Sequence, residues 1–244
     1  ASVLLERIKQ EKERLIKEGL IKREKPVPKL IENTDNSNLP KNWVWSILDD
    51  LVLFINGKAH EQYIDPNGQY ILINSKYISQ NGFKIKRTNK LLTPLSKKDI
   101  AIVMSDVPNG KALARCFLVD DDNQYTLNQR IGGLTPLSDL EADYLLIAVE
   151  RNKHYLGFDN GKTQTNLKKD QILSCPVPLP SVLEQREIVS IINHLMKYFD
   201  ELEKKIEKRD SYQDRIMQAV VKQAFTTKIE TVEEKPADHP NAID

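Results

Sequence analysis

The chain has 244 residues and a mass of 28.0 kDa, enough for one large domain or two modest ones. Hydrophobic residues make up 40% and charged residues 29%, which supports a real core and excludes disorder throughout. The net charge of +1 does not by itself indicate a nucleic-acid partner. Two cysteines cannot form a disulfide framework or a four-ligand zinc site, and they predict thiols in a reducing cytosol. The longest apolar run, residues 144–149, is far shorter than a membrane span, so we expect a cytoplasmic protein without membrane contact.

A helix and a linker are predicted before the main domain. Residues 4–18 place apolar side chains on one side among alternating Glu and Lys, which predicts a helix that stops at Gly19. Prolines at positions 26 and 28 and a run of polar residues then interrupt the helical pattern. We therefore expect a helix within residues 1–25 and a linker over residues 26–42.

Residues 43–180 show the mixed pattern of an α+β domain. Asn-Gly turns separate short β-rich runs, which predict strands over residues 70–73, 100–104 and 113–119. Residues 137–151 have helical spacing, with Ser138 as the expected N-cap and Glu141 at the capping-box position.

One stretch of this domain is charged with a single sign. Residues 66–98 contain no acidic residue and seven cations. Such a stretch is a candidate surface for binding an anion, and the alternative is a lysine-rich loop in solvent.

A long helix is predicted after the domain. Alternating prolines hold residues 176–180 extended, and Ser181 then caps the helix with Glu184 at the capping-box position. Apolar residues recur in alternating steps of four and three, the heptad pattern of a coiled coil. The apolar seam consists of Ile188, Ile192, Leu195, Phe199, Leu202, Ile206, Ile216 and Val220.

The length of this helix predicts a helical partner. A helix over residues 181–227, with its strongest pattern ending near Phe225, cannot bury its seam on the preceding domain alone. The partner is either the helix over residues 4–18 or a helix of a second chain. The acidic, proline-containing residues 228–244 are expected to be disordered.

Catalytic motifs are not found. The glycines at 157 and 161 have three residues between them, where a phosphate-binding loop needs four. The four histidines have no spacing typical of a metal site. We therefore expect no catalytic residue and no metal or cofactor bound by this chain.

The order of the segments resembles the specificity subunits of type I restriction–modification systems, also called HsdS. Residues 176–189, PVPLPSVLEQREIV, are similar to the junction where a target recognition domain of that family meets a conserved helix. Weaker similarities lie in further stretches of the chain, and together they cover nearly all of residues 1–227. These stretches are residues 43–50, 99–105 with 110–111, 127–131, 163–167 and the opening helix.

The resemblance implies a non-catalytic subunit that recognises double-stranded DNA. A specificity subunit has two recognition domains, each reading half of a bipartite site, held apart by antiparallel helices. It assembles with methyltransferase subunits, which use S-adenosylmethionine, and with restriction and translocase subunits, which use ATP and Mg. The expected fold is α+β, with one target recognition domain and a long coiled-coil helix packed with a second helix. Since only one recognition domain is present, the chain is either a fragment or a half-size subunit that forms a homodimer.

The candidate DNA contacts lie at turns and in the acid-free stretch. Lysine and arginine neutralise phosphates, while side chains with donors or acceptors at turn tips read base edges. The candidates are Lys58, Asn74, Lys76, Tyr77, Lys84, Lys86, Arg87, Lys111, Arg115, Arg130, Lys162 and Gln164. Two other functions stay open: a coiled-coil adaptor that binds protein without sequence-specific DNA binding, and the recognition module of a single-chain restriction–methyltransferase.

Overall fold

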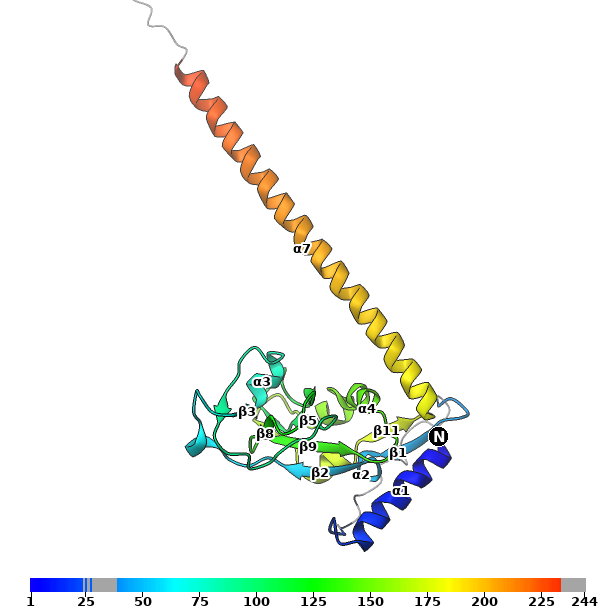
Figure 1. Cartoon of the computed structure of the whole chain (residues 1–244). Coiled ribbons are helices and arrows are strands. Elements are labelled where there is room, and N and C mark those ends of the chain that lie inside the picture. The colour runs from blue at the N-terminus through cyan, green and yellow to red at the C-terminus, as the bar shows by residue number, and fades with distance from the viewer. Residues whose placement is uncertain (24, 26, 28–38, 234–244) are drawn as a thin grey trace, which may run out of the picture. The chain divides into compact units, whose positions relative to one another are not determined.

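The computed structural model describes residues 1–23, 25, 27 and 39–233, with side chains described as far as residue 223. The chain forms two units, Ala1–Val189 and a second unit that begins at Ser190. The first unit holds the mixed α/β domain together with the N-terminal helix. The second consists of the greater part of the C-terminal helix, as Figure 1 shows.

Helix α1, Ser2–Lys17, confirms the predicted N-terminal helix. Leu4 and Ile8 on its apolar side are buried. Gly19 follows in the left-handed conformation with φ of +72°, and its N–H donates to the carbonyl oxygen of Ile16 at 3.1 Å. This is the usual way for a glycine to end a helix.

The apolar side of α1 packs on the first unit itself. Leu4 and Ile8 belong to the same core as Leu48 and Leu51 of α2, Leu48–Leu51. The Nζ atom of Lys12 also donates to the backbone carbonyl of Asp49. The long helix was predicted to pair either with this N-terminal helix or with a helix of a second chain. The apolar face of α1 is already occupied by the core of the first unit.

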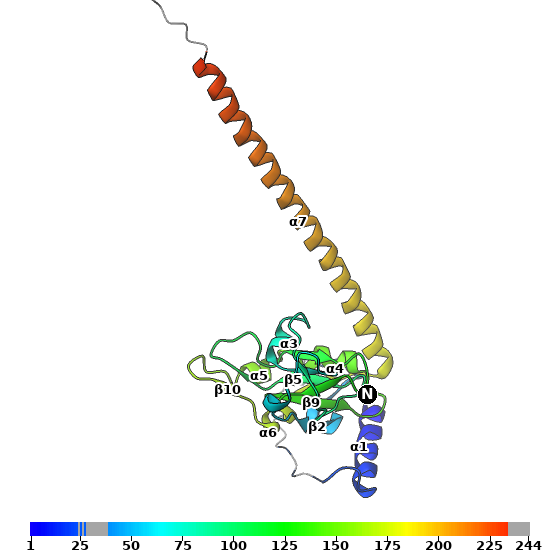
Figure 2. The ribbon, with the colours of Figure 1, turned by 60° about the vertical axis from the view of Figure 1, so that its left-hand side comes forward.

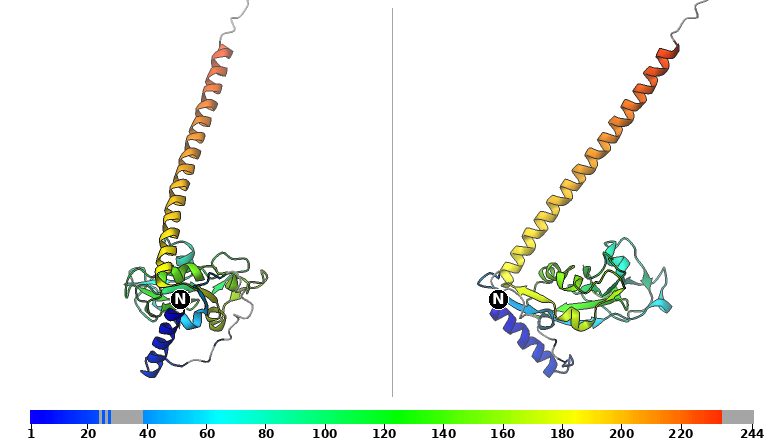
Figure 3. Two further views of the ribbon diagram at one scale, coloured as in Figure 1. Left: turned by 90° about the vertical axis from the view of Figure 1, so that its right-hand side faces the viewer. Right: turned by 180° about the vertical axis from the view of Figure 1, so that it is seen from behind.

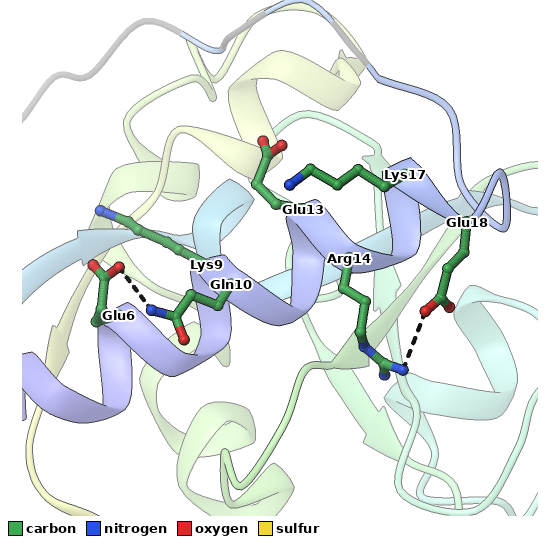
Figure 4. Close-up of a pocket in the computed structure, with 7 residues that line it drawn as sticks. All are labelled: Glu6, Lys9, Gln10, Glu13, Arg14, Lys17 and Glu18. Atoms are coloured by element: carbon green, nitrogen blue, oxygen red, sulfur yellow. Dashed lines mark hydrogen bonds and ion pairs between the residues drawn. The ribbon is translucent and has the colours of Figure 1, made fainter.

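The other side of α1 carries charged side chains, seen in Figure 4. Gln10 donates to the carboxylate of Glu6 at 3.2 Å, and Arg14 pairs with Glu18 at 3.5 Å. Pairs four residues apart on an exposed helix contribute only a few tenths of a kcal/mol each, roughly 0.2–0.5. This face is a solvated helix surface.

The largest sheet has four antiparallel strands in the order β2-β9-β5-β7. The strands are β2 Val52–Asn56, β9 Ile131–Pro136, β5 Ile100–Val103 and β7 Cys116–Leu118. All four residues of β5 are buried, which fits its central place and its continuous apolar sequence. The predicted strand over residues 113–119 is thus shorter than expected.

A second sheet has three strands in the order β4-β3-β8. Strand β3, Tyr70–Ile73, has the predicted bounds and pairs antiparallel with β4, Arg87–Thr88, and parallel with β8, Tyr125–Leu127. Helix α3, Ser75–Ser79, follows β3 directly. The acid-free stretch therefore contributes α3 and the loop that leads from it into β4.

Two short ribbons complete the sheets. Strand β1, Val44–Ile47, pairs with β11, Pro176–Leu179, and β6, Ser105–Asp106, pairs with β10, Thr165–Asn166. Prolines are tolerated in β11 because β1 is its only partner strand in the ribbon. The remaining short helices are η3 Glu61–Tyr63, α4 Ala142–Val149, α5 Lys153–Leu156 and α6 Lys169–Leu173. Within the first unit, the β1·β11 ribbon lies at the end opposite to β3 and α3 (Figures 1 and 3).

The predicted N-cap at Ser138 is wrong. Helix α4 begins only at Ala142, after Glu141, and Ser138 lies in a turn with φ of +50°. The Ser138 hydroxyl donates to the carboxylate of Glu11 on α1, so it is not available to cap a helix. The backbone N–H of Glu141 instead donates to the side-chain oxygen of Gln185 at 3.0 Å.

The predicted start of the long helix is confirmed. Helix α7, Val182–Glu233, follows Ser181, whose N–H donates to the Glu184 carboxylate at 3.0 Å. The N–H of Glu184 donates in return to the Ser181 hydroxyl oxygen at 3.4 Å, which completes a capping box. The Ser181 hydroxyl, which donates to the Glu184 carboxylate at 2.7 Å, and the Ser181 N–H hold the pKa of Glu184 below its usual value.

The end of α7 differs from the prediction. The helix continues beyond residue 227 to Glu233, which corrects the predicted start of the disordered tail. Residues 234–244 lie outside the described residues. No helix in the described part of the chain combines the length and apolar character that crossing a bilayer requires.

The seam of α7 is largely open to solvent. Leu195, Phe199, Ile206, Ile216 and Val220 are between 47% and 65% exposed. Ile188, Ile192 and Leu202 are partly buried. A stripe of apolar side chains along one helix favours a contact with another helix.

Ile8→Ala should destabilise the first unit by about 2–5 kcal/mol, because it removes most of a fully buried side chain. Val3→Ala on the same helix is the matched control, since Val3 is 73% exposed and its loss should cost within about 0.5 kcal/mol. Chemical denaturation of both variants measures the difference. Equal stability of the two variants would show that α1 is not part of the core.

Candidate nucleic-acid interface

Several strands end at one turn, residues 128–131. The N–H of Asn128 donates to the carbonyl oxygen of Ile73, the last residue of β3, at 3.0 Å. The N–H of Gly57, just after β2, donates to the carbonyl oxygen of Ile131 at 3.0 Å. These bonds bring the ends of β2, β3 and β8 to the start of β9. We name this area, formed by residues 56–58, 73–74, 104–106, 128–131 and 164–166, the strand-end surface.

Gly57 permits this close approach. A Cβ atom at position 57 would lie 1.9 Å from the carbonyl oxygen of Asn128, a distance that no side chain can adopt. Glycine is therefore needed for steric reasons at the end of β2. The next residue, Lys58, is exposed, and its N–H donates to the carbonyl oxygen of Leu127 at 3.0 Å.

The strand-end surface continues toward the β6·β10 ribbon. The carbonyl oxygen of Arg130 accepts the N–H of Met104 at 3.0 Å, directly after β5. The side-chain amide of Gln164 donates to the Ser105 hydroxyl oxygen at 2.7 Å. The structure therefore brings together the predicted candidates Lys58, Arg130 and Gln164, which are far apart in the sequence.

Two loops next to this ribbon hold two more predicted lysines. The Asp106 carboxylate accepts the N–H groups of Ala112 at 2.7 Å and of Leu113 at 2.9 Å, which fixes the loop that carries Lys111. The side chain of Asn109 donates to the carbonyl oxygen of Gly161 at 3.2 Å, so this loop is joined to the loop that carries Lys162. Both lysines are exposed. Figure 2 shows β10 and these loops along one side of the first unit.

Helix α3, the loop that follows it and strand β4 carry four more predicted cations. Lys76, Lys84 and Lys86 are exposed. Arg87 is partly buried in β4, and its guanidinium donates to the carbonyl oxygen of Gly68 at 3.4 Å. The three lysines are thus open to solvent, whereas Arg87 helps to hold the turn that contains Gly68.

Tyr77 was predicted to contact bases, but its side chain is buried. It is only 5% exposed, and its ring packs against Phe117 and Tyr125 with centroids 5.2 and 6.4 Å away. Burial raises the pKa of its hydroxyl. Tyr77 is therefore a core residue, and its prediction as a base contact is corrected.

Arg115 and Asn74 also have structural roles. Arg115 forms an ion pair with Glu150 at 2.9 Å, and the same carboxylate accepts the N–H of Cys116 at 2.6 Å. The Asn74 side chain caps α3 by accepting the N–H of Tyr77 at 2.9 Å. We therefore give neither residue a role in base recognition.

The structure adds polar residues that the sequence analysis left out. Asn128 accepts the N–H of Gln129 at 2.6 Å, and the Gln129 amide donates to Glu61 at 2.8 Å. This hydrogen bond lowers the pKa of Glu61, so its charge is partly compensated by a donor. The signal was present in the sequence, since residues 127–131 form one of the stretches that resemble the family.

Neither cysteine is an activated nucleophile, and the described residues hold no metal cluster. Burial raises the pKa of Cys175 to about 11 and that of Cys116 well above its usual value, so both are neutral thiols. Groups of three or more His, Cys, Asp or Glu able to hold a metal ion are absent from this part of the chain. The site is an exposed polar and cationic surface, which suits binding.

Comparison with known proteins shows the protein family to which the chain belongs. The type I restriction modification DNA specificity domain family matches residues 40–209. This range covers the domain and the first part of α7. The chain belongs to this family.

Two curated relatives are specificity subunits from Escherichia coli. The chain is 29% identical over 216 residues to the type I restriction enzyme EcoAI specificity subunit, covering 83% of this chain and 36% of that one. It is 23% identical over 243 residues to the EcoEI specificity subunit, covering 92% of this chain and 41% of that one. The chain therefore spans well under half the length of these curated relatives.

Solved structures support the fold. A chain from a study of assembly and conformational transition in a type I restriction–modification system matches with a TM-score of 0.65 and 17% identity, over 92% of this chain and 54% of that one. The S subunit from M. genitalium matches with a TM-score of 0.51 and 20% identity, over 86% of this chain and 54% of that one. The HsdS subunit from Thermoanaerobacter tengcongensis matches with a TM-score of 0.54 and 17% identity, over 82% of this chain and 47% of that one. These similarities confirm the expected mixed fold with a long C-terminal helix.

Proposed function

We propose that this specificity-subunit chain reads one half of a bipartite DNA site. The observation that carries the proposal is the strand-end surface within the matched family domain. Backbone and side-chain hydrogen bonds there connect the segments that carry Lys58, Arg130 and Gln164, with Lys111 and Lys162 on the adjoining loops. The chain itself performs no catalysis in this proposal and binds no cofactor.

The contacts divide by chemistry. Lysines at exposed turns neutralise phosphates, which supplies affinity that falls as salt rises. Gln164 and Arg130 have side-chain donors or acceptors that can pair with base edges in the major groove. A backbone bond joins Arg130 to Met104 after β5, and a side-chain bond joins Gln164 to Ser105, the next residue along the chain.

The second unit, which consists of most of α7, mediates assembly with other subunits in this proposal. In this proposal the seam of α7 pairs with the same seam of a second copy, which places two recognition domains at a fixed separation. The outer face of the helix pair docks the methyltransferase subunits, which use S-adenosylmethionine. The restriction and translocase subunits, which use ATP and Mg, join that complex. Support comes from the family assignment and from the exposed apolar seam.

Sequencing of methylated DNA tests the function as a whole. Cells that co-express this chain with the cognate methyltransferase subunit should carry a methylated motif with two identical half-sites around a constant gap. A two-fold symmetric dimer reads its two half-sites identically. An asymmetric motif would contradict the homodimer, and absence of any methylated motif would contradict DNA reading by this chain.

Lys111→Ala with Lys162→Ala should weaken binding to duplex DNA and reduce its dependence on salt. Each lost phosphate contact lowers the slope of log affinity against log salt by about one, so the pair should lower it by about two. Fluorescence anisotropy across a salt series measures the slope.

The matched control is Lys22→Ala with Lys41→Ala, two exposed lysines outside the strand-end surface and its adjoining loops. This pair should leave the slope unchanged. Equal slopes for the test and control pairs would place the DNA-binding surface elsewhere.

Leu195→Asp with Leu202→Asp should abolish self-association, because each buried unpaired charge costs several kcal/mol. The matched control is Lys197→Asp with Lys204→Asp, which has the same spacing and introduces the same residue at exposed polar positions. Sedimentation measures the mass, and thermal melting checks that the first unit stays folded. A wild-type chain that is monomeric, or an unchanged dimer in the seam variant, would contradict pairing through α7.

A further inference from the structure

The loop after α3 presents an aromatic side chain to solvent. Phe83 is 92% exposed, the highest exposed fraction among the large apolar residues of the described chain. Single apolar residues on a protein surface are common, so exposure alone assigns no role. The backbone beneath Phe83 and the charges beside it are more informative.

The backbone before Phe83 forms a tight turn. Asn81 and Gly82 both have left-handed backbone angles, with φ of +48° and +80°. The N–H of Phe83 donates to the carbonyl oxygen of Gln80 at 3.0 Å, and the N–H of Gly82 donates to that of Tyr77 at 2.9 Å. Phe83 is therefore carried on a turn with a defined conformation, which reduces the entropy lost when it binds.

The turn lies over a buried aromatic cluster. A Cβ atom at Gly82 would lie 3.5 Å from the hydroxyl oxygen of Tyr77, so the two residues are in close proximity. Tyr77 packs in turn against Phe117 and Tyr125 in the core. The side chain that was expected to contact bases thus supports the turn that carries the exposed ring.

The charges that flank Phe83 in the sequence favour a polyanion. Lys84 and Lys86 are exposed on its C-terminal side, and no acidic residue occurs over residues 66–98. An apolar protein partner would have to desolvate or avoid these lysines. A nucleic acid offers phosphates for the lysines and an apolar stack of bases for the ring.

We infer that Phe83 inserts as a wedge between adjacent base pairs of the bound duplex while Lys84 and Lys86 contact the flanking phosphates. The inference rests on the proposed function, since it names a further residue in the same DNA complex. Apolar side chains that enter a base step partly unstack it and kink the duplex. The kink is easiest at pyrimidine–purine steps, so the wedge adds sequence preference without a hydrogen bond to a base.

Binding of a fluorescein-labelled duplex of mixed sequence to the full chain tests the inference. Phe83→Ala should weaken binding about tenfold at every salt concentration, because the stacking of the ring against the bases is lost. The salt slope should stay that of the wild type, because no charge is removed. Lys84→Ala with Lys86→Ala should instead lower the slope by about two.

Two further variants complete the experiment. Phe83→Trp should retain affinity, and its added fluorescence should be quenched when DNA binds. Leu20→Ala, at a 67% exposed apolar position after α1, should bind like the wild type. Wild-type affinity of Phe83→Ala, or unquenched fluorescence of Phe83→Trp, would overturn the wedge while DNA binding stands. A wild-type chain that does not bind DNA would overturn the proposed function and the wedge together.

Discussion

The strand-end surface depends on the backbone of one turn. Through their N–H and carbonyl groups, residues 128–131 bond to Ile73 at the end of β3, to Gly57 after β2 and to Met104 after β5. Buried backbone groups must find partners, so each of these strands ends where the turn supplies one. The side chains that follow the strands are then gathered on one surface. Gly57 makes the arrangement sterically possible, because any Cβ atom there would collide with Asn128.

Elements whose signals are local were predictable from the sequence. The capping box of Ser181 and Glu184, the glycine stop after α1 and the bounds of β3 all depend on residues close together in the chain. Signals that depend on distant partners were not. Ser138 looked like a helix cap, but its hydroxyl is bonded to Glu11, 127 positions away in the sequence.

The residues of the candidate site were also predictable only where their signals are local. The sequence identified exposed lysines at turns, since turn chemistry and charge are local properties. It could not separate Tyr77 and Arg115 from them, because burial against Phe117 and pairing with Glu150 are long-range contacts. The resemblance to the family marked residues 127–131, but the bond from Asn128 to Ile73, which shows what this turn does, is a long-range contact. Phe83 was only one residue in an acid-free stretch until its exposure was known.

The pairing of β1 with β11 has a consequence for how such chains evolve. Val44 and Leu179 are 135 positions apart in the sequence, yet they are directly paired, so the recognition domain begins and ends at one place. A segment with adjacent ends can be exchanged for another of the same kind without lengthening or redirecting what flanks it. Recombination between genes at two short stretches, one in each strand of this ribbon, would therefore exchange everything between β1 and β11 and leave α7 unchanged.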